Sequence, residues 1–276
     1  MMRLGLNGQS TRAPLERDLQ VAEEAGFHYY EVPFAKLKEY EQAHSLGELR
    51  AYFDRSPLEP YSLNALTMFS FLSEKEEEQM LETLHEMGRM ARALRIPYLV
   101  ICPSTNVPGV SRQQIREETV RVLRRMSEVA AKYQLGLALE FLGFQNCTVN
   151  ELAQAYEIVK EVDRENVGLS VDTFHFYECS RLEDLRGVDK EKIFLFHIND
   201  ADDVPKDQLT DADRVLPGLG VIGLAAFIET LLATGYDKIA SVELFREEYY
   251  AWEPLELAIK ARAATEAVLR QMHSPK

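Results

Sequence analysis

The sequence is poor in cysteine, and the few cysteines that it has lie outside any common functional motif. Among 276 residues there are three, Cys102, Cys147 and Cys179. Their number is odd, their spacing is wide and no CxxC pair occurs, so we expect neither a disulfide framework nor a zinc finger. No base adjoins Cys147 or Cys179 in the sequence, which argues against a thiol nucleophile.

Long apolar runs and an excess of positive charge are also missing. No apolar run reaches the ~18 residues that a transmembrane helix needs, and the first residues contain no apolar segment of the signal-peptide type. We therefore expect a cytoplasmic protein with no membrane partner. The chain has 45 Asp and Glu against 31 Lys and Arg, a formal net charge of −14. This charge argues against a nucleic acid as the main partner.

Several sequence motifs of enzymes are absent as well. There is no GxGxxG after the first apolar run, no GxSxG and no phosphate-binding GxxxxGK[ST] loop. These absences argue against a dinucleotide-binding fold, a serine hydrolase of the nucleophile-elbow type and a P-loop nucleotidase.

What recurs instead is an alternation of short apolar runs with stretches of helical periodicity. Continuous apolar runs of this length are typical of parallel strands that are buried on both faces. The runs are Leu4–Asn7, Tyr29–Val32, Tyr61–Leu66, Tyr98–Cys102, Leu135–Glu140, Val167–Asp172, Ile193–Ile198 and Ile239–Glu243. Between the fourth and fifth runs and elsewhere, apolar residues step by three and four, as on one face of a helix.

Eight strand–helix units in 276 residues leave about 34 residues for each unit, which fits a βαβ repeat. Eight such units with right-handed crossovers close into a barrel. The sequence therefore predicts an α/β protein with a single (β/α)8 TIM barrel domain over residues 1–276. An open, doubly wound sheet is the alternative, and the missing GxGxxG disfavours it.

Four consecutive predicted strands carry an acid or a histidine at the carboxyl end, namely Glu140, Asp172, His197 and Glu243. In a (β/α)8 barrel these ends meet at one rim, where active sites are built. Three carboxylates that converge there repel one another unless a cation compensates them. We therefore expect one divalent metal ion, Mn²⁺, Mg²⁺ or Co²⁺ with Zn²⁺ as a further candidate. The alternative is that these side chains simply cap the barrel and meet solvent.

Two more candidate residues lie in the segments that follow the second and the third of these strands. His175 lies three residues after Asp172, where it serves either as a substrate partner or as a loop histidine packed between aromatic neighbours. Arg214 lies in a long loop, residues 199–223, which we expect to be a lid or binding loop without internal structure. Arg214 either clamps substrate oxygens or forms a surface ion pair with Asp211 or Asp213.

Weaker candidates end the earlier strands. Glu31 ends the second predicted strand, and it either binds substrate or holds a loop in place. The same two alternatives apply to Asn7 and Asn64, which lie at the first and third strands.

With these residues assembled, the chain resembles a known group, the xylose-isomerase-like TIM barrel superfamily of sugar isomerases and epimerases. Within this superfamily, the amino-acid sequences of six segments resemble those of the inosose isomerases of bacterial myo-inositol catabolism. The segments are SLNAL (62–66), ALEFLGFQNCTVN (138–150), AYEIV (155–159), NVGLSVDTFHF (166–176), LTDADRVLPGLG (209–220) and SVELFREEYY (241–250).

The resemblance implies an isomerase of a cyclic keto-polyol, with a small-molecule substrate. The reaction would interconvert 2-keto-myo-inositol and 1-keto-D-chiro-inositol through an enediolate that a divalent metal stabilises. The metal ligands of the family fall on the four rim residues, and Glu140 and Glu243 would also transfer the proton. A dehydratase that acts on an inosose or a dehydroshikimate-type substrate, another ketose isomerase or epimerase, and a non-catalytic polyol-binding module remain as alternatives.

The resemblance also bears on the substrate. The substrate-contacting histidine and arginine of the family fall on His175 and Arg214, and we add Glu31 and Asn64 as substrate-binding candidates. Ketose 3-epimerases carry a glutamate where this chain has Asn146, which argues against an epimerase. A multi-zinc endonuclease would require further histidines at the rim, and none is expected there in this sequence, which argues against that class of enzyme. The sequence does not determine the oligomeric state, and a homo-oligomer is one of the alternatives.

Overall fold

The computed structural model describes residues 2–271, in which eight parallel strands close into a barrel. Around the barrel the strands follow the order β1-β10-β7-β6-β5-β4-β3-β2, so neighbours in sequence are neighbours in space. The barrel strands are β1 (Arg3–Asn7), β2 (Tyr29–Pro33), β3 (Glu59–Thr67), β4 (Tyr98–Cys102), β5 (Gly136–Glu140), β6 (Val167–Asp172), β7 (Ile193–Ile198) and β10 (Ile239–Val242). Each coincides with one of the eight apolar runs to within two residues, which confirms the predicted fold class.

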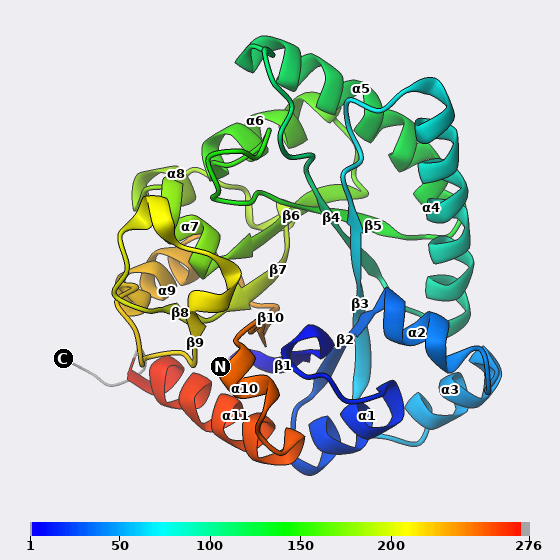
Figure 1. Cartoon of the computed structure of the whole chain (residues 1–276), viewed down its shortest axis with the longest axis vertical. Helices are drawn as coiled ribbons and strands as arrows, with labels where there is room; N and C mark the ends of the chain where they lie inside the picture. The colour runs from blue at the N-terminus through cyan, green and yellow to red at the C-terminus, as the bar shows by residue number, and fades with distance from the viewer. Residues whose placement is uncertain (1, 272–276) are drawn as a thin grey trace.

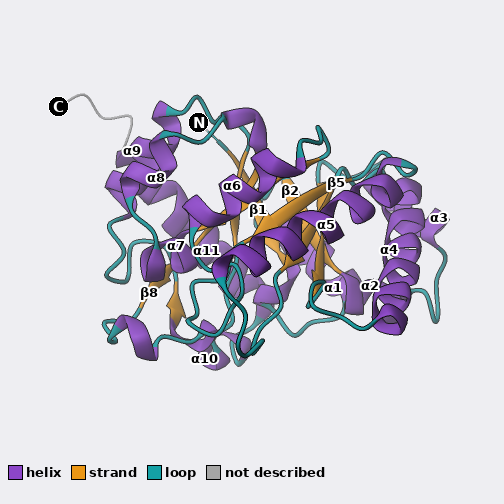
Figure 2. Ribbon diagram, turned by 90° about the horizontal axis from the view of Figure 1, so that it is seen from above, coloured by secondary structure: helices purple, strands orange, loops and turns teal. Residues whose placement is uncertain are grey.

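Helices surround the strands on all sides, as Figure 1 and Figure 2 show. They are α1 (Leu15–Glu24), α2 (Phe34–Tyr40), α3 (Leu46–Phe53), α4 (Glu74–Leu94), α5 (Arg112–Ala131), α6 (Leu152–Val162), α7 (Thr173–Cys179), α8 (Leu182–Arg186), α9 (Leu224–Ala233), α10 (Glu247–Tyr250) and α11 (Pro254–Gln271). Serine side chains start the two longest barrel helices: Ser73 and Ser111 each form a capping box with the third residue of α4 or α5. Among the described residues, no helix combines the length and the apolar character that crossing a membrane requires.

The core forms between the barrel and the inner faces of these helices. On α4 the residues that step by four and three, Met80, Leu84, Met87, Ala91 and Leu94, are all buried. The strands β5, β6 and β7 are buried along their whole length. Because each buried aliphatic side chain contributes about 1.5–3 kcal/mol, this interior holds the strand ends in a fixed register, and that register places the side chains of the rim.

The loop after β7 has internal structure, so the expectation of an unstructured loop is wrong. A two-stranded antiparallel ladder joins β8 (Asp200–Ala201) to β9 (Arg214–Val215). The Asp200 carboxylate accepts backbone hydrogen bonds from Gly218 at 3.0 Å and Ile222 at 2.8 Å. A side chain at Gly220 would collide with the backbone of Ala201, 2.2 Å from a Cβ at that position. The loop therefore folds back tightly, and it holds Arg214 in a fixed place.

Candidate metal centre

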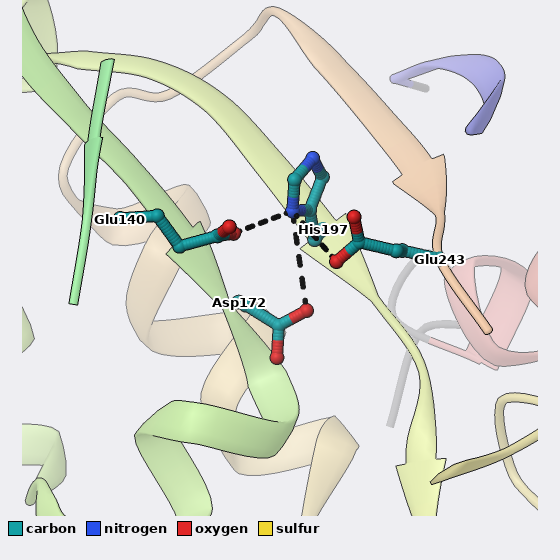
Figure 3. A group of neighbouring side chains, drawn as sticks. All are labelled: Glu140, Asp172, His197 and Glu243. Atoms are coloured by element: carbon teal, nitrogen blue, oxygen red, sulfur yellow. Dashed lines mark hydrogen bonds and ion pairs between the residues drawn. The ribbon is translucent and has the colours of Figure 1, made fainter. Parts of the chain in front are cut away.

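The barrel brings the four predicted rim residues together at its carboxyl end. Glu140 and Asp172 are the last residues of β5 and β6, His197 is the fifth residue of β7, and Glu243 directly follows β10. Asp172 and His197 are partners in the strand register. One ligand atom from each of the four residues lies within 4.8 Å of the others, and all four residues are buried. They converge on one point from four neighbouring strands (Figure 3).

Three carboxylates in this cluster approach a single imidazole nitrogen. His197 Nδ1 lies 2.6 Å from Glu140 Oε1, 3.3 Å from Glu243 Oε2 and 4.0 Å from Asp172 Oδ2 (Figure 3). One ring nitrogen carries at most one hydrogen, so His197 alone cannot satisfy three carboxylates. Three carboxylates and one imidazole are, however, a chemically suitable donor set for a divalent cation. The residues therefore fit the metal that the sequence predicts.

The pKa shifts in the cluster reflect its excess of negative charge. Burial by itself lowers the pKa of His197, but the charges of Glu243, Glu31 and Glu140 outweigh it and hold that pKa well above the usual value. Burial raises the pKa of Glu243, and the negative charge of Glu140 adds to the increase, against the opposing charge of His197. Both shifts have the sign expected where buried carboxylates lack positive charge. A divalent cation would supply that charge.

Neutral donors also hold the carboxylates of the two glutamates. Glu243 Oε1 accepts hydrogen bonds from Asn7 Nδ2 at 2.7 Å and from Asn64 Nδ2 at 3.2 Å. Ser170 Oγ donates to Glu140 Oε1 at 3.0 Å. The structure thus places Asn7 and Asn64 against a candidate metal ligand. The sequence analysis named Asn64 as a substrate-binding candidate. In the structure its side chain donates a hydrogen bond to Glu243, which was not expected.

Arg214 is buried beside the cluster, with 1% of its side chain exposed. Its Nη1 lies 2.6 Å from Asp172 Oδ2 and 3.5 Å from Glu243 Oε2. Its Nη2 lies 2.9 Å from Asp211 Oδ1, so the predicted ion pair with Asp211 exists, with the guanidinium buried and 43% of the Asp211 side chain exposed. Burial opposes ionisation of Asp172, but the charge of Arg214, with those of two histidines, lowers its pKa to about 2.

His175 packs against aromatic side chains, as one of its two predicted alternatives requires. Its side chain is buried, and its ring packs edge-on against Phe144 and Phe174 at centroid distances of 5.2 and 5.7 Å. Its Nε2 also lies 2.9 Å from Arg214 Nη2, and Arg214 in turn contacts Asp172 of the cluster. Its Nδ1 lies 3.5 Å from the carboxylate of Glu178.

Glu31 lies on the other side of His197. Its carboxylate oxygens are 3.1 and 3.2 Å from His197 Nε2, and neither side chain is exposed. Ser62 Oγ donates to the same carboxylate. Burial by itself raises the pKa of Glu31, but the charge and hydrogen bond of His197 and the bond from Ser62 lower it overall. In this structure Glu31 contacts the imidazole of the cluster.

A cavity of about 550 Å³ lies beyond His175 and Arg214. Glu178, which contacts His175, and Asp211, which contacts Arg214, are part of its lining, together with Asn146. His175 and Arg214 do not line this cavity themselves. They are connected to its lining through Glu178 and Asp211, and their own side chains are only 2% and 1% exposed.

The sequence analysis did not identify three residues that contact the site, namely Ser170, Asn199 and Glu178, although their spacing along the chain indicates each of them. Side chains two residues apart on a strand share a face, so Ser170 accompanies Asp172 and Asn199 accompanies His197. Asn199 Nδ2 indeed donates to Asp172 Oδ2 at 2.8 Å. Glu178 lies three residues after His175 on α7, the spacing at which helical side chains meet.

The comparisons with known proteins agree with this geometry. The family model described as xylose isomerase-like TIM barrel matches residues 19–270. The inosose isomerase of Bacillus velezensis is 39% identical over 272 residues, which cover 97% of each chain. A crystal structure of the IolI protein, described as having a binding zinc atom, has a TM-score of 0.96 at 38% identity and covers 99% of this chain and 100% of that one.

A more distant similarity covers part of the chain. The 3-dehydroshikimate dehydratase of Pseudomonas aeruginosa is 34% identical over 135 residues, which are 47% of this chain and 21% of that protein. The near full-length matches decide the classification. The chain belongs to the xylose isomerase-like TIM barrel family, in the group that contains the inosose isomerases.

Proposed function

We propose that this protein is a cytoplasmic, divalent-metal-dependent isomerase that interconverts 2-keto-myo-inositol and 1-keto-D-chiro-inositol. The observation that carries the proposal is the buried convergence of three carboxylates and one imidazole at the rim of the barrel. In this proposal Glu140, Asp172, His197 and Glu243 hold the ion. The full-length similarity to inosose isomerases supports the choice of substrate.

The oxygen-rich donor set favours Mn²⁺, Mg²⁺ or Co²⁺, and Zn²⁺ also accepts carboxylate and imidazole ligands. The zinc atom in the structure of the similar IolI protein supports Zn²⁺ as a candidate. When bound, such an ion supplies a Lewis acid that polarises the ketone and stabilises negative charge on its oxygen.

The isomerisation requires one carbon-bound proton to move between adjacent carbons. A carboxylate removes the proton from the carbon that bears the hydroxyl, and the double bond forms between the two carbons. The former carbonyl carbon then receives a proton. The hydroxyl oxygen of the first carbon loses its own proton to the former carbonyl oxygen, so that the first becomes the new ketone oxygen and the second the new hydroxyl. We assign the two transfers to Glu140 and Glu243, which lie on opposite sides of His197 Nδ1.

His175 and Arg214 are the proposed substrate-binding side chains. Each contacts a residue that lines the cavity of about 550 Å³: His175 contacts Glu178, and Arg214 contacts Asp211. The guanidinium presents planar donors to vicinal oxygens, and its burial beside Phe174 and Phe245 keeps it in a poorly hydrated environment where such bonds are strong. The net charge of −14 also fits a neutral polyol better than an anionic polymer.

The test is product analysis after incubation of the metal-loaded protein with 2-keto-myo-inositol. Chromatography and mass spectrometry would detect a new inosose of unchanged mass, which supports the isomerase. The absence of any new product with metal bound would overturn the assignment to this substrate.

A dehydratase is the second candidate, because of the partial similarity to a 3-dehydroshikimate dehydratase. Removal of the same proton precedes the loss of a β-hydroxyl group in such a reaction, so the residues could be the same. A product that has lost one water, with the ultraviolet absorbance of an enone, would identify this activity in the same experiment.

A further inference from the structure

Glu31 is a completely buried carboxylate that the proposed reaction does not use. Both of its oxygens lie within 3.2 Å of His197 Nε2, and Ser62 Oγ donates a hydrogen bond to its Oε2. Its Oε1 has no hydrogen-bond partner of good geometry within the described residues. A buried carboxylate requires a donor or a positive charge close by. His197 Nε2 is the group that meets this requirement.

Once a cation compensates the carboxylates around Nδ1, this contact determines which nitrogen of His197 carries the hydrogen. An ionised carboxylate only accepts hydrogen bonds, so Nε2 must present N–H toward Glu31. In the neutral ring, Nδ1 then keeps a lone pair, and this lone pair faces Glu140, Glu243 and Asp172. A lone pair among three carboxylates is repulsive without a cation, and it is a good metal ligand with one.

We propose that Glu31 is a positioning residue, which fixes the tautomer and the orientation of His197 so that Nδ1 is available to bind the metal. This role replaces the substrate contact that the position of Glu31 in the sequence suggested. The inference rests on the proposed metal centre, and it does not depend on which polyol is the substrate.

The barrel itself keeps Glu31 in place. Glu31 is paired in the strand register with Asn7 on one side and with Ser62 on the other. Ser62 Oγ is bonded to Glu31 Oε2, so one carboxylate oxygen is anchored to β3 while both remain close to the imidazole. A carboxylate is the required group here because a glutamine could turn its NH₂ group toward Nε2 and favour the opposite tautomer.

The experiment compares metal binding in the wild type, in E31Q and in the matched control E77Q. Glu77 is a buried glutamate of α4, and its carboxylate pairs with Arg121 and Arg125 of α5 rather than with any residue of the cluster. Mn²⁺ and Zn²⁺ dissociation constants would be measured by calorimetry or by competition with a chelator. Loss of such an orienting partner typically weakens metal binding about 10- to 100-fold. We expect that loss in E31Q and wild-type affinity in E77Q.

The outcomes separate this inference from the proposed function. Absence of metal binding in the wild type would refute the metal centre, and with it both proposals. Wild-type binding with equal affinity in folded E31Q would refute only the role of Glu31. Steady-state kinetics at saturating metal add a third readout. We expect the KM of E31Q for 2-keto-myo-inositol to stay within about twofold of the wild-type value. A clearly raised KM in E31Q would show that Glu31 contacts the substrate instead.

A measurement on the wild type keeps the inference testable even if E31Q does not fold. ¹⁵N NMR of the zinc-loaded protein distinguishes the two ring nitrogens of His197, with assignment by the loss of its signals in H197N. We expect a protonated Nε2 and a metal-bound Nδ1. A protonated Nδ1 with metal on Nε2 would overturn the inference.

Discussion

Arg214 Nη1 lies 2.6 Å from Asp172 Oδ2, in a place where neither side chain exposes more than 1% of its surface. A guanidinium thus compensates the charge of one of the four candidate metal ligands, and the same Nη1 lies 3.5 Å from a second, Glu243 Oε2. The same guanidinium lies 2.9 Å from His175 Nε2, next to the cavity. Arg214 therefore links the electrostatics of the centre to the proposed binding of substrate.

We predict that R214A destabilises the metal-free protein strongly. Removal of one partner leaves Asp172 buried without its counter-ion, a change that typically costs about 3–5 kcal/mol of unfolding free energy. R112A is a matched control, because Arg112 forms an exposed pair with Glu151, and such pairs contribute about 0–1 kcal/mol. Urea unfolding of both variants measures the difference. Equal, small losses in the two variants would show that Arg214 is not needed to compensate Asp172.

Conservative changes of the two glutamates test their role in proton transfer. E140Q and E243Q keep the size of each side chain and remove the base. We expect kcat to fall about 10²- to 10⁴-fold in each variant, the usual contribution of a positioned acid or base. Steady-state kinetics at saturating metal, with metal content determined by elemental analysis, checks this. Wild-type turnover by metal-loaded E243Q would contradict the assignment of Glu243.

Asn7 offers a test of how Glu243 is held. Asn7 Nδ2 donates to Glu243 Oε1 at 2.7 Å, and a hydrogen bond to a charged group contributes about 1.5–3 kcal/mol. N7A should therefore lower the unfolding free energy by about that amount. In a double-mutant cycle with E243Q, most of the loss should disappear, because the neutral amide of the glutamine makes a weaker bond. An undiminished effect of N7A in the E243Q background would mean that Asn7 acts elsewhere.

Removal of metal should affect stability as well as activity. Since the proposed ion binds only the folded cluster, it stabilises the protein by about 2.7 kcal/mol when free metal is at 100 times the dissociation constant. EDTA should lower the thermal midpoint and abolish turnover, and added Mn²⁺ or Zn²⁺ should restore both. In D172N the shift with metal should be much smaller. A thermal midpoint indifferent to EDTA in metal-loaded wild type would argue against the centre.

Much of this arrangement is predictable from the sequence because strand ends in a parallel barrel share one rim. The continuous runs up to Glu140, Asp172 and Ile198 predict both the strands and the meeting of their last side chains. Contacts between side chains from distant strands are not predictable in this way. The contact of Glu31 with His197 crosses the barrel interior, and spacing along the chain contains no information about it.

The loop after β7 shows a second limit. Its length suggested a lid without internal structure, but Asp200 binds three backbone N–H groups of the loop and organises it. Buried backbone N–H groups need hydrogen-bond acceptors, but which side chain accepts from them depends on the path that the folded loop takes. The sequence alone does not reveal that path. The sequence placed Arg214 in that loop, and only the fold shows that it reaches Asp172.

The ion pairs between α4 and α5 lead to a pH-dependent prediction. Hydrogen bonding to Arg121, with the charges of Arg121 and Arg125, lowers the pKa of Glu77 below its usual value of 4.5. A depressed carboxyl pKa stabilises the folded state above the unfolded pKa, and this contribution is lost as the pH falls through the folded pKa. The unfolding free energy of E77Q should thus be lower than that of the wild type at neutral pH, and the two should converge below about pH 4.5. A difference that is constant down to strongly acidic pH would show that Glu77 acts through packing alone.

The most direct test of the central claim follows the substrate protons. Metal-loaded protein would be incubated with 2-keto-myo-inositol in D₂O and monitored by NMR, beside an EDTA-treated sample. The account predicts the appearance of 1-keto-D-chiro-inositol, deuterium at the carbon that receives the proton, and neither change after EDTA. A ligand that stays unchanged and free of deuterium in the metal-loaded sample would contradict it.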